Sequence, residues 1–588
     1  MQGTYLSAAA PPQQSLAQGK VFRLSAFSFV RVSAFRLVLF HRASGACMAS
    51  GSSASNASSS QACSNVCPAS IEPSQILDGS YLGTLAKEHA AAFSSVIVPV
   101  TPPETTLLWG TICSGGEVLL FTMKELHNLY VAMGFKLRFV HRFSCEIKPA
   151  LQAWICSVNH EVGTSADGAE TDDMKYCLFE RAEDMGKSVA KCVRHNKFCI
   201  VPNVDLLMMG TSCKDISRAS SAYRADQLVM NMQSSIGGSA ETFSGAEAYM
   251  LLHIVQIFLF ENVDALDDAG DLTTHMTNLS VVYGRLEKCG FALKTFLMDT
   301  VLFGLPQSRR RYYIIGLKES AAAHFDFSSK SASQVLGTVE NLVRLCQRTP
   351  PCASMLLLGE DDCEIDNELN RRLAMGQKGS KYNVSAAISQ FQGAGLSWGA
   401  VDARSGTQDT LWYDTLTKLQ RNVLKYSEAY CKDAMFRDIG QSSSRVRYSQ
   451  AIQDKHTVFC QMPGQLVWVR RPEPEKLPRL QVGREALTCQ GYPIAKIPST
   501  ISMTSERAMQ GIAGNMMSAP VTLALLQSLF AALPWRPSSH SKSTQTTERD
   551  VDEALAVFNA ASSSNPASDD VSPRVKRLRR LRIRPNAE

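Results

Sequence analysis

The sequence predicts an α/β fold with a parallel sheet that carries helices on both faces. From about residue 105 to residue 317, strand-like apolar runs alternate with helical patterns, which is typical of such a sheet. Residues 318–480 are polar and irregular, and a strong pattern returns only within 481–535.

The predicted elements follow one another with short connections over much of this span. In chain order they are a strand at 105–113, a helix at 116–134, a strand at 138–147, a helix at 148–160, a strand at 204–210, a long helical stretch, a strand within 253–263, an apolar run at 312–315 and a helix at 518–533.

The bulk composition allows a large core without requiring a particular partner. The chain has 588 residues and is 45% hydrophobic, enough for about two to four folding units. Its net charge of +6 permits a polyanionic partner but does not demand one. The apolar stretch Val21–Phe40 is interrupted by three arginines, so no membrane span is predicted.

The 17 cysteines form no dense, regular framework, which fits a reducing compartment. Cys63 with Cys67, and Cys192 with Cys199, are loose pairs, and neither has a convincing second half. The sequence therefore predicts no metal site.

The two ends of the chain point to different compartments. The first 71 residues contain no acid, which resembles an organelle transit peptide; a disordered extension and a true start at Met48 are the alternatives. The last 18 residues carry seven basic groups between Arg574 and Arg584, typical of nuclear targeting or a phosphate-binding arm, with a solvated tail of no role as the alternative. We expect the nucleus, with a plastid or mitochondrion as the alternative.

Candidate site residues follow the carboxyl ends of predicted strands, where ligands bind in α/β sheets. The segment "CSGGE" at 113–117 follows the first strand, and its glycines allow close approach of the backbone to a ligand. Glu146 follows the second strand, where an acid typically accepts hydrogen bonds from ribose hydroxyls; a solvated acid is the alternative.

Later strands end in further candidates. Cys213, in "GTSCKDIS", is either a nucleophile or a buried inert thiol. Glu261, in "ENV", ends a strongly apolar strand, a setting that suits proton donation. The arginine run 309–311 borders the apolar run 312–315, as a surface turn or as a cluster that faces an anion or polarised ligand.

Taken in order, these motifs resemble those of the cytosine-5 methyltransferase family. "CSGGE", "SCEI", "GTSC", "ENV" and "GLPQSRRRYYIIG" stand in the family's order, followed by "REALTCQGYP" and "GNMMSAPV". The resemblance covers 105–317 and 480–533. It implies a Rossmann-like S-adenosylmethionine-dependent methyltransferase sheet with a smaller inserted target-recognition domain.

The resemblance also implies how the chain is divided. The implied regions are a disordered or targeting extension at 1–90, the first part of the catalytic domain at 91–317, a target-recognition-like region at 318–480, the closing part of the catalytic domain at 481–535 and a disordered basic tail at 536–588.

The implied activity is methyl transfer to C5 of cytosine in DNA through a covalent adduct. Cys213 would attack C6, and Glu261 would hydrogen-bond to N3 and the exocyclic amine. Arg309 and Arg311 would stabilise the O2 carbonyl and the thiolate, and Arg310 should face away because alternate strand residues share a side. The family's glutamine, here Gln307, would support the cysteine loop.

The implied cofactor is S-adenosylmethionine, and the implied partner is DNA. The residues that match the family's cofactor positions are Cys113, Ser114, Gly115, Glu146 and Asn515.

Two positions beside the nucleophile depart from the family pattern, because Ser212 replaces a proline and Lys214 replaces a glutamine. One alternative is a tRNA cytosine-5 methyltransferase of the same fold, whose usual Cys-Phe-Thr is absent from "CKDIS". The other is a noncatalytic nucleic-acid-binding relative that has kept the fold.

Overall fold

The computed structural model describes the central part of the chain. The described residues are 70–96, 104–162, 176–220, 223, 227–268, 270, 275–321, 324–376, 388–389, 392, 411–431, 433–441, 447–452, 455–471 and 476–536. Met48, the Cys63 and Cys67 pair, the Val21–Phe40 stretch and the basic tail lie outside these residues, so what the sequence predicts of them stays a prediction.

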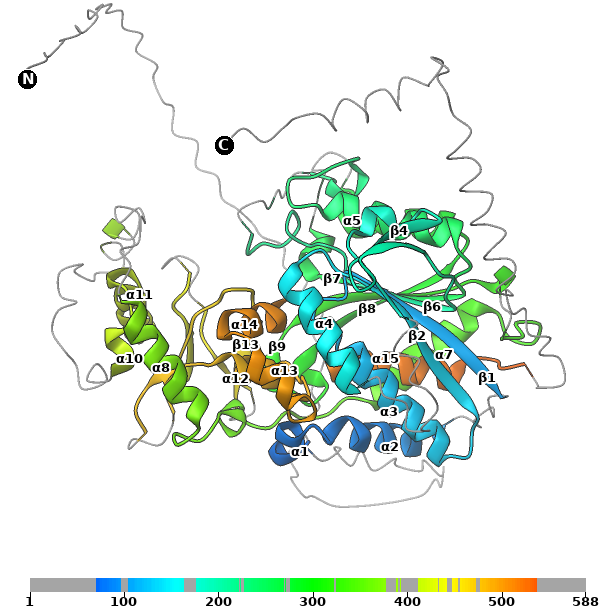
Figure 1. Ribbon diagram of the computed structural model, residues 1–588. Helices are drawn as coiled ribbons and strands as arrows, with labels where there is room; N and C mark the ends of the chain where they lie inside the picture. Colours follow the sequence, from blue (N-terminus) through cyan, green and yellow to red (C-terminus); the bar gives the residue numbers. More distant parts are fainter. Residues whose placement is uncertain are drawn as a thin grey trace, which may run out of the picture. The chain divides into compact units, whose positions relative to one another are not determined.

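A nine-stranded sheet forms the centre of the described residues, in the order β5-β4-β3-β2-β1-β6-β7-β10-β8 (Figure 1). Its strands are β1 (Thr105–Ile112), β2 (Leu137–Cys145), β3 (Cys177–Phe179), β4 (Val189–Cys192), β5 (Lys197–Ile200), β6 (Leu206–Met209), β7 (Ile257–Val263), β8 (Ala292–Asp299) and β10 (Arg310–Leu317).

The middle of this sheet is the predicted parallel one. β3, β2, β1, β6 and β7 are parallel neighbours, and β6 and β7 are buried along their whole length, as expected of strands covered on both faces. β10 lies antiparallel between β7 and β8, and β4 and β5 add an antiparallel hairpin beside β3. The α/β class is confirmed, with antiparallel strands at both edges.

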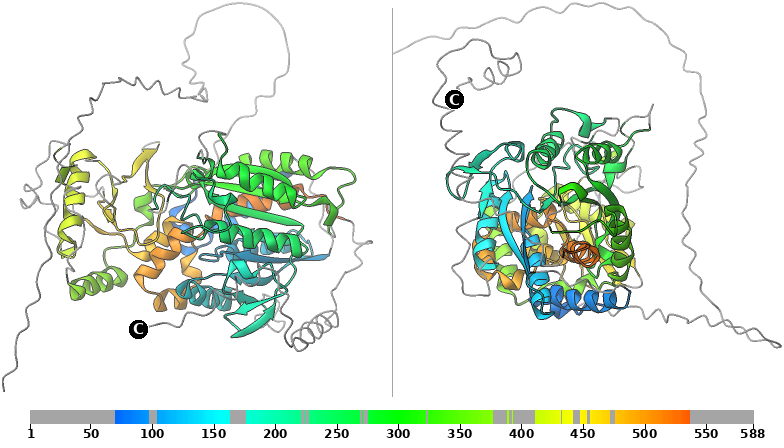
Figure 2. Two further views of the ribbon diagram at one scale, coloured as in Figure 1. Left: turned by 90° about the horizontal axis from the view of Figure 1, so that it is seen from above. Right: turned by 90° about the vertical axis from the view of Figure 1, so that its right-hand side faces the viewer.

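Alternate residues of the strands belong to two separate cores, and helices cover both faces of the sheet (Figure 2). Leu206 and Met208 pack with α2, α3, α7 and α15, whereas Leu207 and Met209 pack with α5 and α6. The helices beside this sheet are α2 (Tyr81–Ser94), α3 (Leu119–Ala132), α4 (Pro149–Val162), α5 (Ser239–Leu252), α6 (Asn278–Lys288), α7 (Ala332–Leu345) and α15 (Ala519–Ala532).

The first two helices lie inside the region that was predicted as an extension. α1 (Pro73–Asp78) and α2 are folded, and α2 contacts α3 and α15. Leu82 and Leu85 are buried, and the Tyr81 hydroxyl donates to the Gly491 carbonyl. The predicted boundary at residue 90 is therefore wrong, because the apolar face of α2 forms part of the core.

The polar insertion begins later than residue 318. α7 carries a capping box at Ser331 and packs on α15 and β8, so it belongs with the large sheet. The described elements beyond it are α8 (Cys363–Met375), α10 (Leu411–Asp414), α11 (Lys418–Tyr430), β11 (Phe436–Asp438), β12 (Gln450–Ile452), β13 (Lys455–Phe459), β14 (Val467–Val469) and β15 (Arg479–Leu480). Leu416, Val423 and Trp468 belong to a separate small core among them.

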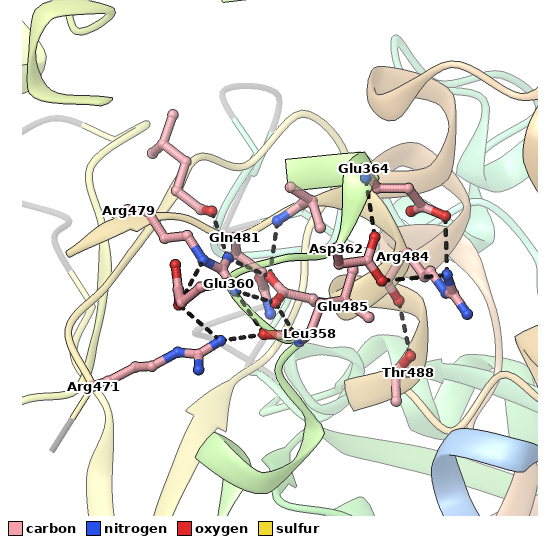
Figure 3. A network of polar contacts seen from close by, with 12 residues as sticks. Leu358, Glu360, Asp362, Glu364, Arg471, Arg479, Gln481, Arg484, Glu485 and Thr488 are labelled. Carbon is pink, nitrogen blue, oxygen red and sulfur yellow. Dashed lines mark hydrogen bonds and ion pairs between the residues drawn. The ribbon is translucent and has the colours of Figure 1, made fainter. Parts of the chain in front are cut away.

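A buried polar network joins this insertion to α12 (Gly483–Cys489) (Figure 3). Arg479 donates to both carboxylate oxygens of Glu485, at 3.0 and 2.7 Å. The same carboxylate accepts from the backbone N–H of Leu358 at 2.8 Å and of Val482 at 3.0 Å. Glu485 thus ties β15 and the segment after α7 to the closing part of the chain.

Among the described residues, one helical stretch, Glu506–Ala532, is long and apolar enough to cross a membrane by length and composition. It contains α14 (Glu506–Asn515) and α15, and 89% of its most apolar window is buried inside the protein. α15 contacts α2, α3 and α7, so this stretch is packed as a core helix. The helix α13 (Pro498–Met503) lies between α12 and α14 in the chain.

Candidate active site

Glu261 and Arg311 come together because β7 and β10 are antiparallel neighbours. Glu261 lies opposite Tyr313, and Arg311 lies opposite Val263. This register brings Arg311 Nε within 3.2 Å of Glu261 Oε1, and the two side chains are only 14% and 12% exposed. The pair is therefore an ion pair largely shielded from water, where charge interactions are stronger than at the surface.

The two alternate arginines converge on Cys460, a residue that the sequence analysis did not single out. Arg309 Nη1 and Arg311 Nη2 each donate to Cys460 Sγ at 3.3 Å. Arg309 also donates to the Met516 carbonyl at 2.9 Å. Arg310 is exposed, so the expected alternation along the strand is confirmed.

The Cys460 thiol is held in a strongly electropositive place. Burial raises the pKa of this thiol, but the positive charges of Arg311, Arg309 and Arg447 lower it by more. The net effect is a pKa lowered from 9.0 to about 7. The neighbouring guanidinium groups therefore favour the thiolate form of Cys460. No local sequence pattern marks it, because it follows β13 and is about 150 residues from the arginines in the chain.

Cys213 lies in the turn after β6 and is half-buried. Hydrogen bonds from two other segments hold this turn. The Asn262 side chain, from the "ENV" motif, donates to the Thr211 carbonyl at 3.3 Å and hydroxyl at 3.2 Å. Asp215 accepts from the Gly237 N–H at 2.6 Å.

Ser212 uses groups that a proline does not have. Its backbone N–H donates to the Thr242 hydroxyl at 3.0 Å, and its own hydroxyl donates to the Gly237 carbonyl at 3.0 Å. Proline has no N–H and fixes φ by its ring. Two hydrogen bonds therefore hold this turn where the family's proline would restrict it.

The charges of the arginine pair and of Glu261 act on Cys213. Burial raises the pKa of the Cys213 thiol, Arg311 and Arg309 lower it, and Glu261 raises it, with a net increase above 9.0. The charges of Glu261, Arg309 and Arg311 thus all act on the pKa of Cys213, and burial favours its thiol form.

The predicted cofactor loop after β1 has an unusual backbone. Cys113, Gly115 and Glu117 have φ of 57°, 59° and 52°, values that non-glycine residues seldom adopt and that concentrate at functional sites. The Ser114 N–H donates to the Cys145 carbonyl at 3.1 Å. The Gly115 N–H donates to Glu146 Oε2 at 3.2 Å, so this loop and the predicted ribose acid are in contact.

Glu117 is a further buried acid at this loop, and the sequence analysis gave it no role. Its Oε2 accepts from the Ser144 hydroxyl at 2.6 Å and the Thr111 hydroxyl at 2.9 Å. Its Oε1 has no hydrogen-bond partner among the described residues. Burial raises the pKa of Glu117 from 4.5 to about 7, although these hydroxyls oppose the change. The sequence signal that could have identified Glu117 was its place directly after Gly115 and Gly116.

Asn515 borders the cofactor loop through its backbone. A Cβ at Gly115 would lie 2.5 Å from the Asn515 carbonyl oxygen, so this close approach requires glycine. The Asn515 side chain is exposed, and its amide donates to the Gly511 carbonyl at 2.6 Å.

Gly210 separates the cofactor loop from the arginine and cysteine group. A Cβ at Gly210 would lie 3.5 Å from both the Cys113 carbonyl and Glu261 Oε2. Gln307 is fully buried, and neither atom of its amide has a hydrogen-bond partner within the described residues. Its predicted support of the Cys213 turn is therefore not visible as a hydrogen bond.

Comparison with known proteins places this geometry in context. The sequence model of the family described as "C-5 cytosine-specific DNA methylase" matches residues 187–531, more than half of the chain. The DNA (cytosine-5-)-methyltransferase DMT5 of Cryptococcus neoformans is 25% identical over 442 residues, which are 70% of this chain and 16% of that protein. The type II methyltransferase M.HaeII of Haemophilus aegyptius is 30% identical over 133 residues, which are 22% of this chain and 35% of that protein.

This chain thus spans well under two thirds of the length of either curated relative. Among solved structures, the Entamoeba histolytica methyltransferase EhMeth matches with a TM-score of 0.36 at 12% identity, over 72% of this chain and 98% of that chain. The S. pombe Dnmt2 methyltransferase matches with a TM-score of 0.35 at 13% identity, over the same two shares.

Proposed function

The chain belongs to the C-5 cytosine-specific DNA methylase family, and on this premise we propose that it transfers a methyl group from S-adenosylmethionine to C5 of cytosine in DNA. The observation that carries the proposal is the group formed by Cys213, Glu261, Arg309 and Arg311. These residues come from three separate segments and influence one another electrostatically beside the loop at 113–117.

In the proposed reaction, the Cys213 thiolate forms a bond to C6 of cytosine. The electron pair of the C5–C6 double bond then makes C5 nucleophilic. Glu261 hydrogen-bonds to N3 and the exocyclic amine, and Arg309 and Arg311 stabilise the charge that develops at O2. After methylation, loss of the C5 proton restores the double bond and releases Cys213.

The resting state of Cys213 sets a requirement for this reaction. Because burial holds its pKa above 9.0, the thiol must lose its proton when substrate binds. Arg311 and Arg309 are the cations that lower the pKa of this thiol, and at rest both donate to Cys460. We infer that substrate entry redirects these arginines from Cys460 towards Cys213 and the base.

The residues of the 113–117 loop fit S-adenosylmethionine. Glu146 offers carboxylate oxygens suited to ribose hydroxyls, and Glu117 Oε1 is a buried acceptor that has no partner among the described residues. Glycine at 115 lets the Asn515 backbone pack against this loop, and Ser114 and Cys113 complete the turn. When bound, the cofactor supplies an electrophilic methyl group.

The insertion beyond α7 is proposed as the DNA-recognition region. It has its own small core, and the Arg479–Glu485 network fixes it to the catalytic part. A base in a duplex must be flipped out of the stack before C6 can be reached. The insertion supplies Cys460 to the site, so DNA contact there can be coupled to the two arginines.

Tritiated methyl transfer to DNA and to tRNA tests the proposal against both alternatives. We expect label in cytosine-containing duplex DNA and none in DNA that lacks cytosine. Label in tRNA alone would favour the tRNA enzyme. No label in either substrate, combined with retained DNA binding, would favour a noncatalytic relative. The nucleus is the proposed compartment, with an organelle as the alternative.

A further inference from the structure

The hairpin of β4 and β5 brings three cysteines and one histidine to a single point. Cys177 comes from β3, Cys192 ends β4, His195 lies in the hairpin loop, and Cys199 lies in β5. The three sulfur atoms and a ring nitrogen all lie within 4.8 Å of one another. This cluster belongs to the edge of the sheet and contains none of the residues proposed for catalysis.

The separations within the cluster match those of ligands around one metal ion. His195 Nδ1 lies 3.4 Å from Cys192 Sγ, 3.4 Å from Cys199 Sγ and 3.7 Å from Cys177 Sγ. Around a tetrahedral zinc ion, bonds of about 2.3 Å to sulfur and about 2.05 Å to nitrogen place these two ligands about 3.6 Å apart. The three observed distances bracket this value.

Hydrogen bonding alone does not account for this convergence. Neutral imidazole has one N–H, and a thiol is only a weak donor and acceptor. One nitrogen therefore cannot satisfy three sulfur atoms that surround it at similar distances. A cation that binds all four atoms gives each of them a partner.

We propose that Cys177, Cys192, His195 and Cys199 form a structural zinc site. Three thiolates and one imidazole are a known donor set for structural zinc, and four protein ligands leave no open position for chemistry. The ligands are buried or half-buried, so the site is shielded from bulk water. Arg194 and Lys197 flank His195 in the sequence and offset the negative charge of three thiolates.

The site adds an attachment for a hairpin that is joined to β3 by few backbone contacts. β3 and β4 share a single registered residue pair, Phe179 with Cys192, and Phe198 of β5 is 73% exposed. A two-stranded hairpin is marginal by itself. A metal bound to Cys177 as well as to the hairpin ligands joins the hairpin directly to β3.

The zinc site also stabilises one wall of the proposed cofactor pocket. The Glu146 N–H donates to the Phe179 carbonyl at 3.0 Å, so the position of β3 sets the position of this acid. The Glu180 N–H donates to the Lys191 carbonyl at 3.2 Å, which links the end of β3 to β4. Loss of metal is therefore expected to disturb Glu146 without removing a cofactor ligand.

The proposed site departs from the expectation that the chain has no metal site. Cys192 and Cys199 were visible as a pair, but their partners could not be assigned from spacing. Cys177 lies on the preceding strand, β3, and His195 lies between Cys192 and Cys199 in the sequence. Folding of the hairpin beside β3 brings the four residues together.

X-ray absorption at the zinc edge and metal analysis of the full-length protein test the proposal. We expect one zinc per chain, with three sulfur ligands and one nitrogen ligand. Cys192→Ser should lose most of the bound zinc. Cys156→Ser is the matched control, because Cys156 is a half-buried cysteine of α4 outside the cluster, and it should keep zinc at the parental level.

Absorption on the parent protein needs no variant, so it decides the question even if Cys192→Ser does not fold. Zinc with only oxygen and nitrogen ligands, or protein that stays zinc-free after growth with added zinc, would overturn the proposal. A disulfide between two of the three cysteines, detected as a mass loss of two hydrogens under non-reducing conditions, would also overturn it. These readouts are independent of methyl transfer.

Discussion

Arg311 Nε lies 3.2 Å from Glu261 Oε1, across the antiparallel pair of β10 and β7. The same guanidinium donates to Cys460 Sγ at 3.3 Å and lowers the pKa of Cys213. One side chain therefore connects the proposed acid, the proposed nucleophile and the insertion. This position explains why an arginine is held at the edge of a hydrophobic strand.

Glu261 and Glu146 are expected to have separable roles. Glu261→Gln should slow methyl transfer by about 10² to 10³-fold, the loss typical of a charge-stabilising group, with cofactor affinity nearly unchanged. Glu146→Ala should weaken cofactor binding by about 1.5 to 3 kcal/mol, because it removes charged hydrogen-bond acceptors. Calorimetry with S-adenosylmethionine and single-turnover rates measure the two effects. The assignment fails if Glu261→Gln loses the cofactor while Glu146→Ala keeps it.

Cys460 is expected to be reactive at neutral pH. Its thiolate fraction, and with it the rate of alkylation by iodoacetamide, should rise with a midpoint near 7 rather than 9, because Arg311, Arg309 and Arg447 favour the thiolate. Peptide mass spectrometry across a pH series measures this rate at Cys460 and Cys213 separately. Cys213, whose pKa is raised, should react only at higher pH.

Arg447→Gln provides a control for this electrostatic account. Arg447 donates to the Cys460 carbonyl at 3.0 Å and lies outside the proposed catalytic group. Its removal should move the Cys460 midpoint upward and leave the Cys213 midpoint nearly unchanged. A Cys460 midpoint near 9 in the parent protein would contradict the account.

The Arg479–Glu485 pair is expected to be a major source of stability for the insertion. Glu485→Gln would leave Arg479 as a charge that is only 2% exposed, which typically costs about 3 to 5 kcal/mol. Glu360 is a weaker partner of Arg479, at 3.6 Å and 41% exposed, although it also pairs with Arg471 at 3.1 Å, so Glu360→Gln should cost less than Glu485→Gln. Denaturant unfolding of the parent and both variants measures the difference. A Glu485→Gln variant as stable as the parent would show that the Arg479–Glu485 pair in Figure 3 is not important for folding.

The basic tail is expected to affect localisation or nonspecific DNA binding and not the methyl-transfer step. Deletion of residues 571–588, which removes seven basic groups, should reduce nuclear accumulation of a tagged protein. If the tail contacts phosphates, deletion should also make DNA binding less dependent on salt, because fewer counterions are released. The tail has neither role if both readouts are unchanged. Organellar import with cleavage before Glu72 would overturn the nuclear assignment.

The sequence predicted the elements whose apolar pattern is long and regular. The strand at 105–113 and the helix at 116–134 correspond to β1 and α3, and the apolar helix near the end corresponds to α15. The helix α2 was missed because it follows a long acid-free segment and shows its apolar face only against α3 and α15. The position of β10 between β7 and β8 depends on long-range pairing, which local pattern does not contain.

The sequence singled out the candidate residues that lie at or just after the end of an apolar strand, namely Cys213, Glu261 and Glu146. It singled out Arg309 and Arg311 by the alternation expected along a strand, although β10 itself begins only at Arg310. Cys460 was not, because its importance arises from contact with arginines about 150 residues away. Cys177 and His195 were missed for the same reason, since only the folded hairpin brings them to Cys192. Contacts between side chains that are distant in the sequence could be identified only from the structure.

Covalent trapping on DNA that contains 5-fluorocytosine tests the central claim most directly. Fluorine at C5 cannot leave as a proton does, so the enzyme stays bonded to C6 after methyl transfer. With S-adenosylmethionine present, we predict a stoichiometric complex whose DNA-linked peptide contains Cys213, and no complex with Cys213→Ser. A complex through another cysteine, or none from a folded protein that binds both cofactor and DNA, would contradict the account.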